Sequence, residues 1–83
     1  DINPLYKTHL LIITKKHISS VNDVSTEDDD IFAGIFSVAK TVAIKEGVEK
    51  SGYRLVVNTG KDAGQIVDHF HMHILAGQPL NNL

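Results

Sequence analysis

The sequence predicts an α+β domain, in which one main helix covers an antiparallel β-sheet. Three observations predict it: an apolar run near the start of the chain, a helical stripe in its middle, and two apolar segments joined by a short polar loop. The 83 residues leave room for a single domain, spanning residues 1–83. Because one helix covers only part of such a sheet and the core is small, we expect a homodimer.

Residues 8–14 predict the first strand. This segment is apolar, rich in Ile and Leu, and preceded by Pro4. Residues 18–24 are polar and irregular, as is typical of a loop.

A helix is predicted to begin at residues 25–28. Ser25 can accept hydrogen bonds from the amides of the first turn, and Asp28 can reach back. Gly47 is a plausible C-terminal stop. The apolar residues between these ends follow 3.6-residue spacing and predict one buried stripe, made of Ile31, Phe32, Ile35, Phe36, Ala39, Val42 and Ala43.

Two further strands are predicted, at residues 53–58 and 67–75. The loop between them, residues 59–65, contains two glycines. Such a tight connection makes the two strands antiparallel neighbours in one sheet.

Composition excludes several classes of function. A net charge of −2 and a pI near 6.2 give no broad attraction to nucleic acid or to an anionic membrane. No apolar run approaches the ~20 residues that span a bilayer, so we expect a cytoplasmic protein. With no cysteine, disulfides, thiolate metal sites and cysteine nucleophiles are excluded. The chain begins with Asp1 rather than Met, almost directly before a strand, so we expect that an N-terminal segment is missing.

Histidine occupies every second position from residue 69 to residue 73. Side chains alternate faces along a strand, so His69, His71 and His73 are expected on one face, with neighbours ~7 Å apart. The apolar residues between and after them are expected to point into the core; these are Phe70, Met72 and Ile74. Packing alone does not produce such a pattern, whereas the lone His17 is interpreted as an ordinary polar side chain.

Two kinds of chemistry fit aligned imidazoles. Two histidines at i and i+2 can bind one zinc ion, but three such positions span ~13 to 14 Å and cannot easily all reach one ion at ~2.1 Å. Phosphoryl or nucleotidyl transfer suits an extended row better, because one imidazole can attack phosphorus while the others bind oxygens. The glycine loop, whose amides can approach an anion, and the neighbouring Asn58 and Gln65 favour this second interpretation. We therefore assign neither a metal ion nor another cofactor.

The run His-Phe-His-Met-His-Ile-Leu at residues 69–75 resembles the signature of the histidine triad (HIT) superfamily. The similarity covers essentially the whole chain and is greatest to the Hint-like branch of nucleotide-binding proteins. The segments that carry it outside the signature are residues 1–2, 8–13, 15–18, 52–58, 64–65 and 76–80.

The resemblance implies a homodimer whose two sheets join into one. It also implies binding of purine nucleoside monophosphates such as AMP, and hydrolysis of P–N bonds in nucleoside phosphoramidates. His71 would be the nucleophile that forms a nucleotidyl-histidine, and His69 would orient it. His73 would contact the phosphate and the leaving group, and His9 would join as a fourth histidine.

The resemblance also implies a nucleotide-binding set. Asp1 would accept from the ribose hydroxyls and Ile2 would flank the base. The phosphate would be held by Asn58, Gly64 and Gln65, together with the backbone of Ile66 and Val67.

Two positions depart from the family pattern. Ile66 stands where a Ser or Thr is common, so a hydroxyl that could aid protonation of the leaving group is absent; we expect an altered rate or leaving-group preference. Gln78 stands where an Arg is frequent.

Three alternative functions stay open: a dinucleoside polyphosphate hydrolase of the Fhit-like branch, a nucleotide-binding regulator with vestigial catalysis, and, third, a zinc hydrolase.

Overall fold

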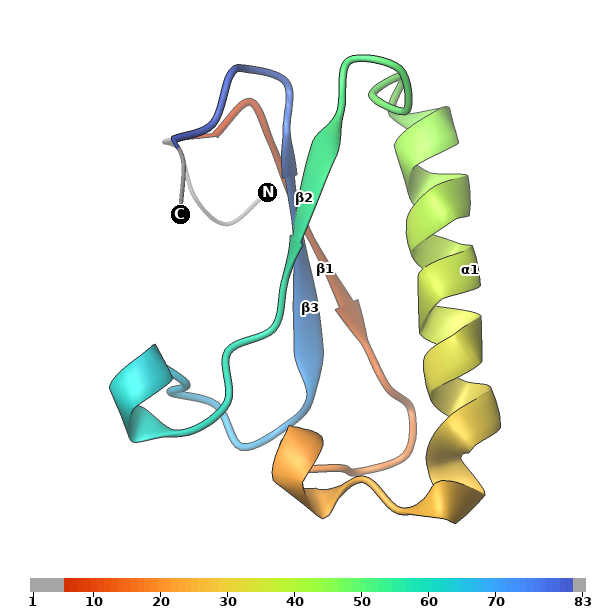
Figure 1. Ribbon diagram of the computed structural model, residues 1–83, viewed down its shortest axis with the longest axis vertical. Coiled ribbons are helices and arrows are strands. Elements are labelled where there is room, and N and C mark those ends of the chain that lie inside the picture. Colours follow the sequence, from red (N-terminus) through yellow and green to blue (C-terminus); the bar gives the residue numbers. More distant parts are fainter. Residues whose placement is uncertain (1–5, 82–83) are drawn as a thin grey trace.

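A computed structural model describes residues 6–81 of the chain (Figure 1). Asp1 and Ile2, both predicted to bind nucleotide, lie outside the described residues. The elements in order are β1 (Thr8–Ile13), η1 (Val21–Asp23), η2 (Thr26–Asp28), α1 (Asp29–Lys45), β2 (Tyr53–Val56), η3 (Lys61–Ala63) and β3 (His71–Ala76), where η marks a short 3-10 turn.

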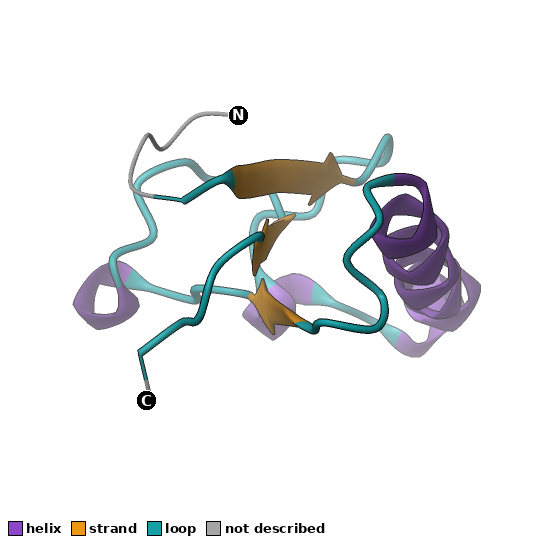
Figure 2. Ribbon diagram, turned by 90° about the horizontal axis from the view of Figure 1, so that it is seen from above, coloured by secondary structure: helices purple, strands orange, loops and turns teal. Residues whose placement is uncertain are grey.

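The three strands form one sheet in the order β1-β3-β2, and both pairs are antiparallel. Helix α1 covers one face of this sheet, whereas η3 and the C-terminal tail (residues 77–81) lie on the opposite side (Figure 2). The predicted α+β class, with one main covering helix, is confirmed. Among residues 6–81, none of the helices has the length and apolarity needed to cross a membrane.

The register of the sheet decides which residues share a face. Leu11 of β1 pairs with His73 of β3, and Ile13 pairs with His71. Directly paired residues point to the same side of an antiparallel sheet. The histidines therefore share their face with the odd-numbered residues of β1, on the side that the helix leaves open.

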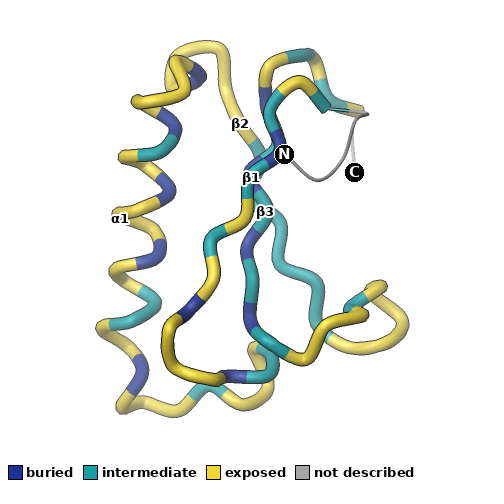
Figure 3. Tube along the Cα trace, turned by 180° about the vertical axis from the view of Figure 1, so that it is seen from behind, coloured by how far each residue is buried: buried dark blue, intermediate teal, exposed yellow. Residues whose placement is uncertain are grey.

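The other face of β3 forms the core. Met72 and Ile74 are buried there, together with Ile35 and Ala39 from the inner side of α1, and Figure 3 shows the buried positions of the helix turned toward the sheet. Phe70, just before β3, belongs to the same cluster. The prediction that Phe70, Met72 and Ile74 point inward is confirmed.

The start of the helix follows the predicted pattern in part. The buried Asp28 carboxylate reaches back and accepts hydrogen bonds from the amide and hydroxyl of Ser25, at 3.1 and 3.2 Å. Lys16 Nζ donates to the other carboxylate oxygen at 2.6 Å. A 3-10 turn nevertheless comes first, so α1 itself begins at Asp29; at the other end Gly47 has a positive φ of 73°, as its predicted role requires.

The prediction of the buried stripe is wrong for one residue. Phe36 is 58% exposed, although Ile35, Ala39 and Ala43 are buried. Phe36 lies about 100° around the helix from Ile35 and so stands at the margin of the stripe. There it lines an apolar hollow beside Val24 and Val57 rather than entering the core.

The predicted bounds of the strands need correction. All three strands were predicted too long at one end, and β3 begins at His71 rather than at residue 67. The reason at β3 is a long-range hydrogen bond: the amide of Phe70 donates to the carbonyl of Ile18 at 2.6 Å, in the loop that follows β1. The connection between β2 and β3 therefore covers residues 57–70, and His69 lies just outside the sheet.

Candidate active site

A shallow groove of about 290 Å³ runs along the open face of the sheet. Its histidines come from β3 and the residues just before it, and its apolar side chains come from β1 and the η3 connection. The lining residues are Leu11, Ile13, Val67, His69, His71 and His73. The structure thus brings the predicted histidine trio to one surface, although His69 is not part of the strand.

His71 has a defined ring orientation. Its Nδ1 atom lies 2.8 Å from the carbonyl oxygen of His69. A carbonyl oxygen can only accept a hydrogen bond, so Nδ1 carries the hydrogen and donates it. In the neutral ring the lone pair is then on Nε2, which is the nucleophilic nitrogen that a phosphoryl-transfer reaction needs.

His73 forms a pair with His9 of β1. The two ring nitrogens, Nδ1 of His73 and Nε2 of His9, are 2.8 Å apart. One nitrogen must accept while the other donates, so both rings cannot be charged at once in this arrangement. His9 is buried, and the Tyr6 ring meets it edge-on with 5.8 Å between ring centroids.

Burial changes the acid–base behaviour of this pair. It lowers the pKa of His73 below the ordinary 6.5, and the neighbouring His9 and His71 rings lower that pKa further by charge repulsion. Burial also lowers the pKa of His9. The pair is therefore held neutral near pH 7, where His73 can supply one donor and one acceptor.

His69 is anchored through its side chain. Its Nε2 atom lies 2.7 Å from the carbonyl oxygen of Thr14, so Nε2 carries the hydrogen and donates it. The His17 ring meets the His69 ring at 5.2 Å between centroids, although His17 itself is exposed and does not line the groove.

The glycine loop between β2 and β3 lies beside the groove. Gly60 and Gly64 both have φ of 84°, a conformation that other residues adopt only with strain. The Gln65 side chain holds this loop: Oε1 accepts from the amide of Gly60 at 2.9 Å, and Nε2 donates to the carbonyls of Ser19 at 2.7 Å and Val67 at 3.1 Å. Both amide hydrogens of Gln65 are thus engaged with backbone.

The other predicted site residues are placed differently. Asn58 is half-buried just after β2 and does not line the groove. Val67 does line it, whereas Ile66 is 92% exposed at the end of the loop. Sequence reasoning missed Leu11 and Ile13, which the alternation along β1 could have placed on the face of His9.

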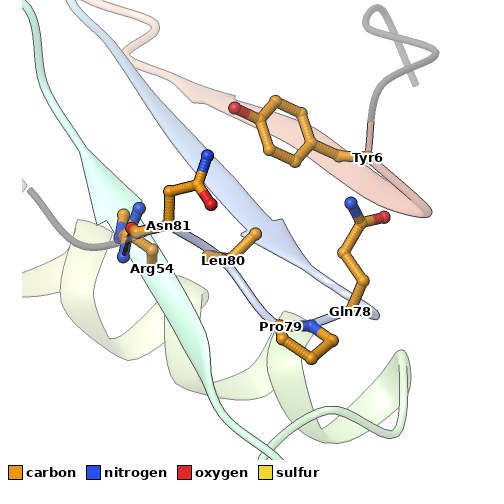
Figure 4. Close-up of a pocket in the computed structure, with 6 residues that line it drawn as sticks. All are labelled: Tyr6, Arg54, Gln78, Pro79, Leu80 and Asn81. Carbon is orange, nitrogen blue, oxygen red and sulfur yellow. Dashed lines mark hydrogen bonds between the residues drawn. The ribbon is translucent and has the colours of Figure 1, made fainter.

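A second, polar hollow of about 240 Å³ lies at the other end of the open face, under the C-terminal tail (Figure 4). Arg54 of β2 donates from its guanidinium to the carbonyl of Asn81 at 2.6 Å, and Gln78 accepts from the amide of Lys7 at 2.9 Å. Tyr6, which touches His9, also lines this hollow. The tail is thereby fixed beside the His9–His73 pair.

Within residues 6–81, no three or more His, Cys, Asp or Glu side chains are grouped so as to hold a metal ion. Each of these histidines already uses one ring nitrogen: His9 and His73 bond to each other, and His69 and His71 bond to main-chain oxygens.

The sequence and the fold both match known proteins. The HIT domain family model matches residues 1–80. The chain is 46% identical over 80 residues to the purine nucleoside phosphoramidase of Escherichia coli strain K12. The aligned region covers 96% of this chain and 67% of that protein. The chain belongs to the HIT domain family. The predicted resemblance is confirmed.

Solved structures agree with this assignment. A HIT family hydrolase from Legionella pneumophila Philadelphia 1 superposes with a TM-score of 0.93 at 47% identity, covering 98% of this chain and 72% of that one. A Plasmodium falciparum diadenosine triphosphate hydrolase, solved with cyclomarin A, gives a TM-score of 0.69 at 27% identity, covering 94% and 52%. The expectation that this HIT protein is a hydrolase is confirmed.

Proposed function

We propose that this protein is a nucleotide-binding hydrolase that cleaves the P–N bond of purine nucleoside phosphoramidates through a covalent nucleotidyl-His71 intermediate. The observation that carries the proposal is the hydrogen bond from His71 Nδ1 to the His69 carbonyl, at 2.8 Å. It leaves the Nε2 lone pair of a groove-lining imidazole free to attack phosphorus.

The reaction would run as two displacements. His71 Nε2 forms a bond to phosphorus as the P–N bond breaks, and the departing amine takes up a proton. Water then attacks phosphorus and releases the nucleoside monophosphate and the free His71 ring. An amine that is protonated as it leaves is a much better leaving group than an alkoxide, which favours P–N over P–O cleavage.

The flanking groups suit the charge that develops on the phosphoryl oxygens. When His9 Nε2–H donates a hydrogen bond to Nδ1 of His73, the neutral His73 ring carries its own hydrogen on Nε2. This Nε2–H is then a free donor beside His71. The amides of the Gly60–Gln65 loop, with the backbone of Ile66 and Val67, are the proposed phosphate donors. Because its amide hydrogens are engaged, Gln65 would act here by holding the loop.

The remaining assignments are part of the same proposal. Asn58 and Gly64 would contact phosphate, and Asp1 and Ile2 would hold the ribose and base. We also propose a cytoplasmic homodimer with one continuous sheet, in which the exposed edges of β1 and β2 are the candidate joining strands. The identity to an Escherichia coli purine nucleoside phosphoramidase supports the purine phosphoramidate substrate class.

The direct test is to incubate the purified protein with adenosine 5′-phosphoramidate and follow AMP release. His71→Ala should abolish turnover while AMP binding, measured by calorimetry, survives. His17→Ala is the matched control for the loss of an imidazole: His17 is exposed and does not line the groove, so the variant should keep most of the activity although the His17 ring meets the edge of His69. Brief mixing and quenching in an alkaline denaturant should trap AMP on His71, because a P–N bond to imidazole is labile in acid; the adduct is detected by peptide mass spectrometry at neutral or alkaline pH. Near-normal turnover by His71→Ala excludes the mechanism.

The structural similarity to a diadenosine triphosphate hydrolase supports a second candidate, hydrolysis of dinucleoside polyphosphates by the same histidines. Comparing kcat/KM for diadenosine triphosphate and for adenosine 5′-phosphoramidate separates the two. If neither substrate turns over while AMP still binds, a nucleotide-binding regulator is the better description.

A further inference from the structure

The main-chain carbonyl that orients His71 lies outside the sheet. The strand begins at His71, so no ladder hydrogen bond to β1 holds the backbone of His69. Two other contacts fix this segment: the amide of Phe70 donates to Ile18 at 2.6 Å, and the His69 ring donates to the Thr14 carbonyl at 2.7 Å. The orientation of His71 therefore depends in part on Ile18 and Thr14, which do not line the groove.

Thr14 contacts the His69 ring through two of its oxygen atoms. It follows β1 directly and is 5% exposed. Its hydroxyl donates to the carbonyl of Lys16 at 2.8 Å, which braces the turn that presents the Thr14 carbonyl. With its hydrogen used in this way, Oγ1 turns a lone pair toward His69 Nε2, 3.3 Å away.

Two oxygens of one residue thus surround His69 Nε2, and both are acceptors there. This arrangement requires the hydrogen of a neutral His69 ring to be on Nε2, which leaves Nδ1 with the lone pair. A valine would keep the carbonyl and the branched shape of Thr14. It would remove the brace to Lys16 and the second acceptor.

We propose that the Thr14 hydroxyl is a positioning group for the reaction: it fixes the His69 ring, and through the His69 carbonyl it fixes the ring of His71. The chain of contacts runs from the Lys16 carbonyl to Thr14, from Thr14 to the His69 ring, and from the His69 carbonyl to His71 Nδ1. The catalytic part of this inference rests on the proposed role of His71; the anchoring of His69 does not.

The test compares Thr14→Val with Thr14→Ser, which keeps the hydroxyl. In Thr14→Val, exchange of the His69 Nε2 hydrogen with water, measured by NMR on ¹⁵N-histidine-labelled protein, should quicken about two- to tenfold, the loss of one ordinary hydrogen bond. The kcat for adenosine 5′-phosphoramidate should fall by a similar factor with little change in KM, because Thr14 does not line the groove. Thr14→Ser should restore both values.

The two readouts separate the possible failures. A wild-type spectrum that shows the hydrogen of the neutral His69 ring on Nδ1 instead of Nε2 overturns the proposal with no variant needed, and so does an unchanged exchange rate in Thr14→Val. If the wild-type protein lacks phosphoramidase activity, the proposed function fails, and the NMR comparison still decides whether Thr14 anchors His69. If Thr14→Val does not fold, Thr14→Ala takes its place in the same comparison.

Discussion

The Nδ1 atom of His71 lies 2.8 Å from the main-chain oxygen of His69, two residues earlier in the chain. A main-chain oxygen is present whatever the side chain of residue 69 is, so the contact itself does not require histidine there. The His69 ring has a different task, since it ties the same peptide segment to Thr14 through Nε2. The His71 ring is thus oriented by the backbone of residue 69, whereas the His69 ring holds that backbone in place.

This difference predicts unequal losses. His71→Ala removes the proposed nucleophile and should lower kcat/KM on the order of 10³-fold or more. His69→Ala keeps the orienting carbonyl but frees its segment, and should cost roughly 10- to 100-fold, the range for a misplaced reacting group. Both are measured with adenosine 5′-phosphoramidate, with His17→Ala as control. Equal losses in the two histidine variants would mean that His69 reacts with the substrate directly.

The His9–His73 pair predicts a pH dependence of stability. Burial lowers the pKa of both rings below 6.5, so just below this pH the unfolded chain binds more protons than the folded one. The free energy of unfolding should therefore rise with pH up to 6.5, and the contribution is lost as the pH falls through the lower folded-state values.

Urea unfolding across this pH range measures the effect. His9→Gln removes one ring of the pair and one cause of the His73 shift, so it should flatten the slope below pH 6.5. His17→Ala should leave the slope as it is in wild type. The same slope in wild type and His9→Gln would rule out the pair as the origin of the dependence.

Two glycines predict opposite responses to the same substitution. Gly77 has φ of 89°, and a Cβ there would lie 2.8 Å from Lys7 Cβ. Gly77→Ala should destabilise by at least the ~1 to 2 kcal/mol of a left-handed conformation. Gly34 is in α1 with nothing within 4 Å of an added Cβ, so Gly34→Ala should stabilise by ~0.5 to 1 kcal/mol. Thermal unfolding of the two variants checks both signs, and a stabilised Gly77→Ala would contradict the tail geometry.

Local periodicity predicted most of the fold. The helix and all three strands were found because apolar residues recur at helical or strand spacing, a signal that lies within each segment. The errors arise where the structure depends on contacts beyond the local segment. The start of β3 depends on the Phe70 amide bonding to Ile18, and Phe36, at the margin of the helix stripe, is 58% exposed.

The site shows the same division. Period-two spacing brought out the trio on and just before β3, and only the resemblance to a family pointed to His9, which meets His73 across 64 positions of sequence. Thr14 has no sequence signal, because a threonine at a strand end is ordinary and its contact with His69 spans 55 positions. Tertiary contacts of this kind follow from the register of the sheet rather than from any local pattern.

Ile66 offers a test of leaving-group specificity. It is 92% exposed at the end of the glycine loop, beside the groove-lining Val67, and it brings no hydroxyl to protonate a departing amine. Ile66→Ser should raise kcat about two- to tenfold for phosphoramidates of basic alkylamines, the worth of one added hydrogen bond. Ile66→Ala removes the same apolar bulk without adding a donor. Steady-state kinetics on both variants separate the causes: an equal gain in Ile66→Ala would assign the effect to bulk, and no gain in either would show that position 66 does not reach the leaving group.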